Sequence, residues 1–140
     1  MHIIEESAEK NDNSMVKAMK KILLIEDDTN FVYIMKTIVE TKDRKLFAVS
    51  DVENAINILI KNNNTIDLIL TDYNLRCNNT CMPIFDYLRG LNLDIPVIVL
   101  SANEYEDYAD KVKNAGALAC YDKTSLSISK IREIVSGILK

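Results

Sequence analysis

The stretch KILLIEDDTNF, residues 21–31, joins four consecutive aliphatic residues to three consecutive acidic ones. The aliphatic run at 22–25 is apolar on successive positions, which is typical of a strand that is covered on both faces of a sheet. Glu26, Asp27 and Asp28 follow it directly. Neighbouring carboxylates repel one another and are costly to bury, so the end of a buried strand needs a reason to carry three of them.

The rest of the chain repeats the alternation of short aliphatic runs with longer segments of helical periodicity. We expect strands at residues 21–25, 45–49, 66–71, 96–100 and 117–121. The spacing of apolar residues predicts helices at 31–39, 52–59 after Asp51 as N-cap, 84–91, 104–115 and 125–138. This order predicts an α/β fold, a doubly wound parallel sheet of five strands with helices on both faces.

The length and composition of the chain indicate one globular domain, and its charge limits the possible partners. The chain has 140 residues, 48% of them hydrophobic, and a formal net charge of -4, which gives no electrostatic reason to bind nucleic acid or an anionic membrane. No apolar run approaches the roughly 18 residues of a membrane span, and the polar start lacks a secretion signal. We therefore expect a cytoplasmic protein with a flexible leader at residues 1–19 and a domain at 20–140.

The residue inventory argues against several kinds of site. Cys77, Cys81 and Cys120 are an odd number of cysteines in a chain without an export signal, so we expect reduced thiols. A zinc site needs about four ligands, and His2 in the leader is the single histidine. None of the three glycines follows the first aliphatic run, which excludes a phosphate-cradling nucleotide loop there.

Polar residues at the ends of four predicted strands can converge on one point. In an open parallel sheet these strand ends meet at one edge, where ligands bind. The residues expected to converge there are Glu26, Asp27, Asp72, Ser101 and Lys123. Clustered carboxylates suit Mg²⁺, and a metal beside an ammonium neutralises phosphoryl oxygens while an aspartate attacks in line. The sequence therefore predicts a site for phosphoryl transfer.

Four motifs in order carry a family resemblance: ILLIEDD at 22–28, DLILTD at 67–72, PVIVLSA at 96–102 and AGALACYDK at 115–123. With them, residues 20–140 resemble the CheY-like receiver domain of two-component response regulators. The resemblance implies a flavodoxin-like sheet of strand order 2-1-3-4-5 and phosphorylation of Asp72, with Lys123 and Ser101 as catalytic residues. The implied Mg²⁺ ligands are Glu26, Asp27, Asp72 and the backbone carbonyl of Asn74.

The resemblance also implies partners. A receiver takes its phosphoryl group from a sensor histidine kinase or a phosphotransfer protein. It catalyses its own phosphorylation and dephosphorylation without being an enzyme in the ordinary sense. It signals to a downstream protein through the face made by the helix at 104–115, the strand at 117–121 and the last helix. Because that helix reaches Lys140, we expect output through protein contacts unless the chain is part of a longer one.

Two alternatives accompany this interpretation, and the chain departs from the family pattern on its fifth strand. A pseudo-receiver would keep the fold as an interaction module without phosphorylation, and a haloacid-dehalogenase-type phosphatase would also use a strand-end aspartate. The phosphatase needs a second carboxyl two residues on, where this chain has Asn74. Cys120 stands where the family has its switch aromatic, so we expect phosphorylation to move residues 104–108 without an aromatic flip at Tyr121, unless Tyr121 replaces that aromatic.

Overall fold

The computed structural model describes residues 18–102 and 105–140. Its sheet has five parallel strands in the order β2-β1-β3-β4-β5, which confirms the predicted α/β topology. The strands are β1 (Lys20–Ile25), β2 (Arg44–Val49), β3 (Leu68–Asp72), β4 (Val97–Ser101) and β5 (Ala119–Asp122). Residues 1–17 of the leader predicted at 1–19, and the predicted helix start at Glu104, lie outside the described residues.

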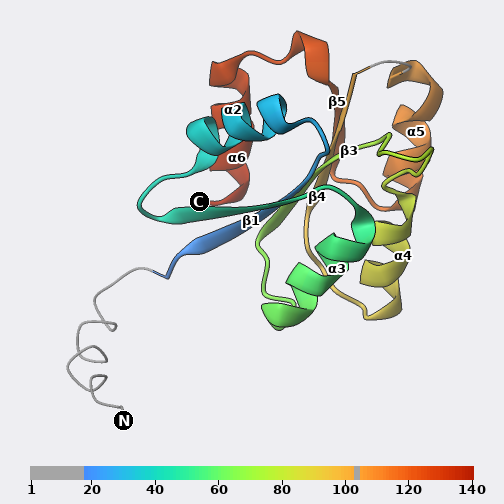
Figure 1. The fold of residues 1–140 in the computed structure, drawn as a ribbon, viewed down its shortest axis with the longest axis horizontal. Coiled ribbons are helices and arrows are strands. Elements are labelled where there is room, and N and C mark those ends of the chain that lie inside the picture. Colours follow the sequence, from blue (N-terminus) through green and yellow to red (C-terminus); the bar gives the residue numbers. More distant parts are fainter. Residues whose placement is uncertain (1–17, 103–104) are drawn as a thin grey trace.

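Five α-helices of the described residues cover the two faces of this sheet. They are α2 (Thr29–Val39), α3 (Val52–Lys61), α4 (Met82–Gly90), α5 (Tyr105–Ala115) and α6 (Ile128–Ile138). Figure 1 shows α2 and α6 on one face, and α3, α4 and α5 on the other. A short 3-10 helix, η1 (Lys123–Ser125), follows β5.

Two hydrophobic cores lie between the sheet and its helices. Successive side chains of a strand point to opposite faces, and β1 divides accordingly. Leu23 and Ile25 belong to the core under α3, α4 and α5, whereas Ile22 and Leu24 belong to the core under α2 and α6. All four side chains are fully buried. The uninterrupted apolar run therefore indicated a central strand covered on both faces, as predicted.

Side-chain caps set several helix boundaries. Asp51 accepts a hydrogen bond from the N–H of Asn54 and begins α3, which confirms the predicted N-cap. The predicted start of the last helix at residue 125 is wrong. Residues Lys123–Ser125 instead form the 3-10 turn, and Ser127 caps α6 by accepting from the N–H of Lys130. Because Ser127 satisfies an N–H that a helix start leaves unpaired, α6 begins at Ile128.

The helices are short relative to the thickness of a bilayer. Over the described ranges, 18–102 and 105–140, none has the combination of length and apolar character that a membrane span requires.

The three thiols differ in their surroundings, which predicts a selective reaction. Cys77 is exposed, whereas Cys81 and Cys120 are buried. Burial raises the pKa of Cys81 to about 12 and also raises the pKa of Cys120. Since the thiolate is the nucleophile, we expect iodoacetamide at neutral pH to modify Cys77 at least about 100-fold faster than the other two.

Peptide mapping after timed alkylation measures this difference. Alkylation of the unfolded protein in guanidinium is the control, in which all three thiols react. Modification of Cys81 in the folded protein as fast as Cys77 would contradict the prediction.

Candidate functional site

Three carboxylates meet at the carboxyl ends of β1 and β3. Glu26 and Asp27 follow β1, and Asp72 is the last residue of β3. One carboxylate oxygen from each lies within 4.8 Å of the others. The predicted convergence of these acids is therefore confirmed. Carboxylate oxygens at this spacing are hard donors that suit a divalent cation such as Mg²⁺.

Lys123 enters this acidic cluster from the end of β5. Its Nζ lies 2.7 Å from Oε1 of Glu26 and 3.4 Å from Oδ2 of Asp72. The same ammonium lies 4.1 Å from the centre of the Phe31 ring, at cation–π distance. Two carboxylates and one aromatic face thus fix the position of the ammonium beside Asp72.

The Glu26 side chain is also fixed by burial and by its hydrogen bonds. Its side chain is only 1% exposed, and its second oxygen accepts a hydrogen bond of 3.1 Å from the N–H of Asp28. Both carboxylate oxygens therefore have a partner, as a buried charge requires.

Burial dominates the electrostatics of these groups. It raises the pKa of Glu26 and of Asp72, and the hydrogen bond and charge of Lys123 offset only part of that effect. Burial by itself lowers the pKa of Lys123, but the hydrogen bond to Glu26 and the two carboxylate charges raise it overall. The positive charge of Lys123 is therefore secure at neutral pH, and a further cation in the site would favour the ionised carboxylates.

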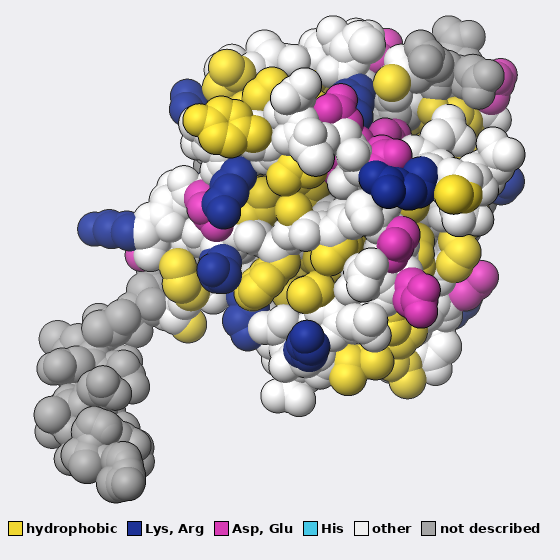
Figure 2. Space-filling model, viewed as in Figure 1, with side chains coloured by type: hydrophobic (Ala, Val, Ile, Leu, Met, Phe, Trp, Pro, Cys, Tyr) yellow, Lys and Arg dark blue, Asp and Glu magenta, His cyan; other side chains and the backbone are white. Residues whose placement is uncertain are grey.

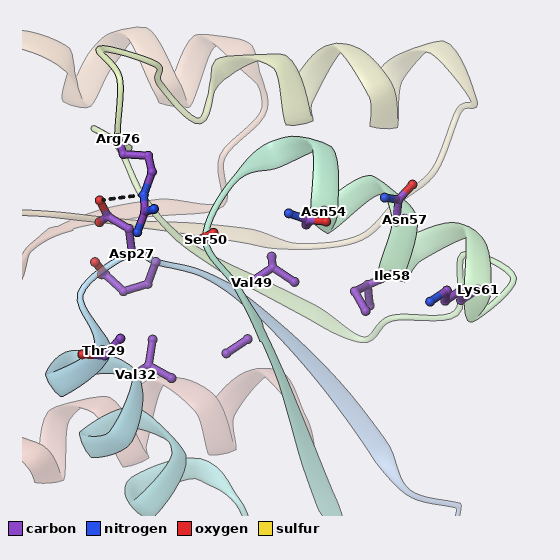
Figure 3. Close-up of a pocket in the computed structure, with 12 residues that line it drawn as sticks. Asp27, Thr29, Val32, Val49, Ser50, Asn54, Asn57, Ile58, Lys61 and Arg76 are labelled. Carbon is purple, nitrogen blue, oxygen red and sulfur yellow. Dashed lines mark ion pairs between the residues drawn. The ribbon is translucent and has the colours of Figure 1, made fainter.

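A cleft of about 510 Å³ opens beside the acidic cluster between α2 and α3. On the face shown in Figure 2, acidic and basic side chains lie together at this end of the sheet, and hydrophobic side chains are visible between the two helices. In Figure 3, Val32 and Thr29 line the cleft from α2, and Asn54 and Asn57 line it from α3.

Arg76 reaches the acidic cluster from the loop after β3. Its Nε lies 3.9 Å from Oδ2 of Asp27, and Figure 3 shows the side chain pointing to that carboxylate. The arginine side chain is 60% exposed, so this is a solvent-screened ion pair. It nevertheless places a second positive charge against a carboxylate of the acidic cluster.

Ser101 ends β4 and is fully buried, but its hydroxyl is engaged on the α5 side of the sheet. The hydroxyl shares a hydrogen bond with the hydroxyl of Tyr108 on α5. The Tyr108 ring in turn stacks on Tyr73, with ring centroids 3.8 Å apart and planes inclined by 9°. The predicted switch hydroxyl therefore lies next to an aromatic residue of α5.

The loop between β3 and α4 folds back on itself without a glycine. Cys81 donates its N–H to the carbonyl of Tyr73 at 2.9 Å, and Asn74 pairs with Thr80 in an antiparallel bridge. Cys77 and Asn78 occupy the left-handed region, with φ of 62° and 60°. Asparagine tolerates that region, and cysteine does so at a cost. The role of the Asn74 carbonyl as a metal ligand stays a prediction.

Sequence reasoning missed the three neighbours of the site. Phe31 and Tyr108 lie in segments of helical periodicity, and Arg76 lies in an irregular loop. Cys120 and Tyr121 face opposite sides of the sheet and pack against different cores, as the alternation of side chains along a strand requires. No pattern along the chain marks these contacts, since each joins a residue to a site formed by other elements.

The family of the chain follows from its sequence as well as its fold. The sequence model of the response regulator receiver domain matches residues 22–136. The chain is 28% identical over 102 residues to the two-component response regulator ARR10 of Arabidopsis thaliana, and 26% identical over 103 residues to ARR2 of the same plant. These matches cover 69% and 70% of the chain, which spans only 17% and 14% of the length of those relatives.

Solved structures of receiver domains have the same fold as this chain. The chain superposes on the receiver domain of a putative Luxo repressor protein from Vibrio parahaemolyticus with a TM-score of 0.76 at 21% identity, over 86% of this chain and 90% of that one. It superposes on the phosphorylated cyanobacterial phytochrome response regulator RcpA with a TM-score of 0.69 at 28% identity, over 86% and 91%. The chain belongs to the response regulator receiver domain family of two-component signalling.

Proposed function

We propose that Asp72 accepts a phosphoryl group from a phosphohistidine of a sensor histidine kinase or phosphotransfer protein, in a reaction that requires Mg²⁺. Receiver domains interact with such proteins. The observation that carries the proposal is the place of Asp72, whose carboxylate lies within 4.8 Å of the two acids that follow β1 and 3.4 Å from the ammonium of Lys123. These intact groups argue against the pseudo-receiver alternative.

The chemistry is an in-line displacement at phosphorus. A carboxylate oxygen of Asp72 attacks the phosphorus atom, the P–N bond to the imidazole breaks, and the imidazole takes the bonding electron pair, which leaves an acyl phosphate on Asp72. Lys123 neutralises charge on the phosphoryl oxygens, and Glu26 and Phe31 hold its ammonium in place. The Ser101 hydroxyl donates a hydrogen bond to a phosphoryl oxygen. These steps make the domain a catalyst of its own modification.

The residues that would hold Mg²⁺ are Glu26, Asp27, Asp72 and the backbone carbonyl of Asn74. Receiver domains bind Mg²⁺ at an acidic pocket, and the three clustered carboxylates here supply the oxygen donors that this cation prefers. When bound, Mg²⁺ supplies charge neutralisation to the transferring phosphoryl group.

Incubation with Mg²⁺ and acetyl phosphate tests the proposed function. We expect intact-mass spectrometry to show the gain of one phosphoryl group, labile to alkali as an acyl phosphate is, and loss of the gain in EDTA. A protein that stays unmodified in Mg²⁺, while a known receiver domain in the same buffer is labelled, would favour the pseudo-receiver function.

Output would leave through the face of α5, β5 and α6, in the cytoplasm. This face carries Leu118, which is 58% exposed, next to a cleft of about 380 Å³ lined by Tyr121 and Ile134. An exposed apolar side chain beside a cleft supports a protein partner there.

Arg76 should weaken metal binding, because its charge lies against Asp27. We expect Arg76→Ala to tighten Mg²⁺ binding about twofold to fivefold, the effect of removing one screened positive charge near a ligand. Calorimetric titration with Mg²⁺ measures the affinity. Arg89→Ala is the matched control, since Arg89 is an exposed arginine paired with Asp86 on α4. Unchanged or weaker Mg²⁺ binding in Arg76→Ala would contradict the electrostatic argument.

A further inference from the structure

Tyr108 joins helix α5 to the ends of the two strands that carry Asp72 and Ser101. Its side chain is buried, with 5% of its surface exposed. Its hydroxyl shares a hydrogen bond with the hydroxyl of Ser101, the last residue of β4. Its ring stacks on Tyr73, which directly follows Asp72, the last residue of β3. Tyr108 therefore connects both strand ends to α5.

The alternation of side chains along the strands places Ser101 and Asp72 on opposite faces of the sheet. Val97 and Val99 share the parity of Ser101 and pack in the core under α3, α4 and α5, as does Tyr108. Leu68 and Leu70 share the parity of Asp72 and pack in the core under α2 and α6. A Ser101 hydroxyl that meets Tyr108 thus points away from the face on which Asp72 projects.

A phosphoryl oxygen on Asp72 can only accept a hydrogen bond, so the Ser101 hydroxyl has to point toward it in order to donate one. Because that hydroxyl points to the α5 side, it must turn to serve a phosphoryl group on Asp72, and this turn takes its oxygen away from the Tyr108 hydroxyl. We propose that Tyr108 is a positioning residue that holds the Ser101 hydroxyl on the α5 side in the unphosphorylated protein, and that phosphorylation takes this hydroxyl from Tyr108 and so releases α5. The inference rests on the proposed function of Asp72.

The position of this aromatic explains how a chain with Cys120 on β5 can still transmit the signal. Cys120 packs in the same core as Tyr108, but its side chain is too small to follow the Ser101 hydroxyl. The coupled aromatic of this chain lies on α5 instead of β5. Tyr121 packs against the opposite core and takes no part in this coupling.

Tyr108→Phe isolates the hydroxyl, because it keeps the ring that stacks on Tyr73. The probe is beryllofluoride with Mg²⁺, an acyl-phosphate analogue, titrated while amide NMR signals are followed. Loss of one buried hydrogen bond that competes with the bound state predicts about threefold to tenfold tighter beryllofluoride binding than in the wild type. The amide signals of residues 107–115 in the free variant should also lie part of the way toward their positions in the wild-type adduct.

Two controls separate this result from a general effect of losing a tyrosine hydroxyl. Tyr87→Phe removes a hydroxyl that bonds Asn64 at 3.0 Å, away from the acidic cluster, and should leave beryllofluoride affinity unchanged. In urea denaturation, Ser101→Ala and Tyr108→Phe should together cost less stability than the sum of the single variants, because both remove the same bond.

The possible outcomes distinguish this inference from the proposed function. If the wild-type protein binds beryllofluoride and Tyr108→Phe binds it equally or more weakly, the role of Tyr108 is overturned and the function of Asp72 stands. Strict additivity of the two substitutions would likewise overturn the role of Tyr108. If the wild-type protein binds no beryllofluoride, both are overturned.

Discussion

Asp72→Asn should abolish phosphorylation of the protein by acetyl phosphate. The amide oxygen of asparagine is a much poorer nucleophile than a carboxylate, and no other carboxylate of the acidic cluster has the same place beside Lys123 at the end of β3. We expect the rate of mass gain to fall by at least about 1,000-fold, as for the loss of a nucleophile in covalent catalysis. Intact-mass spectrometry over a time course measures the rate.

The same variant should remain folded. Replacing one of three neighbouring carboxylates relieves repulsion in the metal-free protein, so its midpoint of urea denaturation should equal or exceed that of the wild type. Asp86→Asn is the matched control for labelling, because Asp86 is an exposed aspartate of α4. Labelling of Asp72→Asn at the wild-type rate would show that another residue accepts the phosphoryl group.

Lys123→Met should cost about 2–4 kcal/mol of unfolding free energy at pH 7.5 without Mg²⁺. The substitution leaves the Glu26 carboxylate, whose side chain is 1% exposed, without the ammonium that lies 2.7 Å away. An unpaired buried charge is more costly than the loss of the pair itself. Lys130→Met is the control, since Lys130 is 48% exposed and forms a surface ion pair with Glu133.

The cost of Lys123→Met should also depend on pH, and the pKa of Glu26 gives the sign. Burial already raises that pKa above the ordinary value of a glutamate, and removing Lys123 removes the interactions that lower it. The native variant then binds a proton more readily than the unfolded chain, so its stability falls as pH rises through this window and recovers as pH falls. The difference from the wild type should therefore be smaller at pH 5.5 than at pH 7.5. A deficit that does not change with pH would contradict an unpaired Glu26.

Much of the acidic cluster was predictable because of how parallel sheets are built. The uninterrupted apolar runs of β1, β3 and β4 identify strands covered on both faces, and such strands lie in the middle of an α/β sheet. Their carboxyl ends share one edge, so residues that directly follow them must meet. Glu26, Asp27 and Asp72 could be placed together for this reason. Lys123 follows β5, whose carboxyl end lies at the same edge, and so it joins Glu26 from 97 positions away.

Local chemistry also fixed the start of α3, because an aspartate at position 51 can accept the N–H bond that a helix end leaves open. The start of α6 was predicted three residues early. Residues Lys123–Ser125 form a 3-10 turn after β5, and Ser127 caps the helix that follows. The spacing of apolar residues does not show where this turn ends and the helix begins.

The sequence by itself determined which polar residues stand at the ends of the strands, and hence which carboxylates form the acidic cluster. Only the tertiary structure decided that Lys123 lies between Glu26 and the Phe31 ring, that Arg76 faces Asp27, and that Tyr108 holds Ser101. The physical reason is the range of the interactions. Strand identity follows from hydrophobic patterns within a few residues, whereas these contacts depend on side-chain rotamers and on how each helix and loop packs against the twisted sheet.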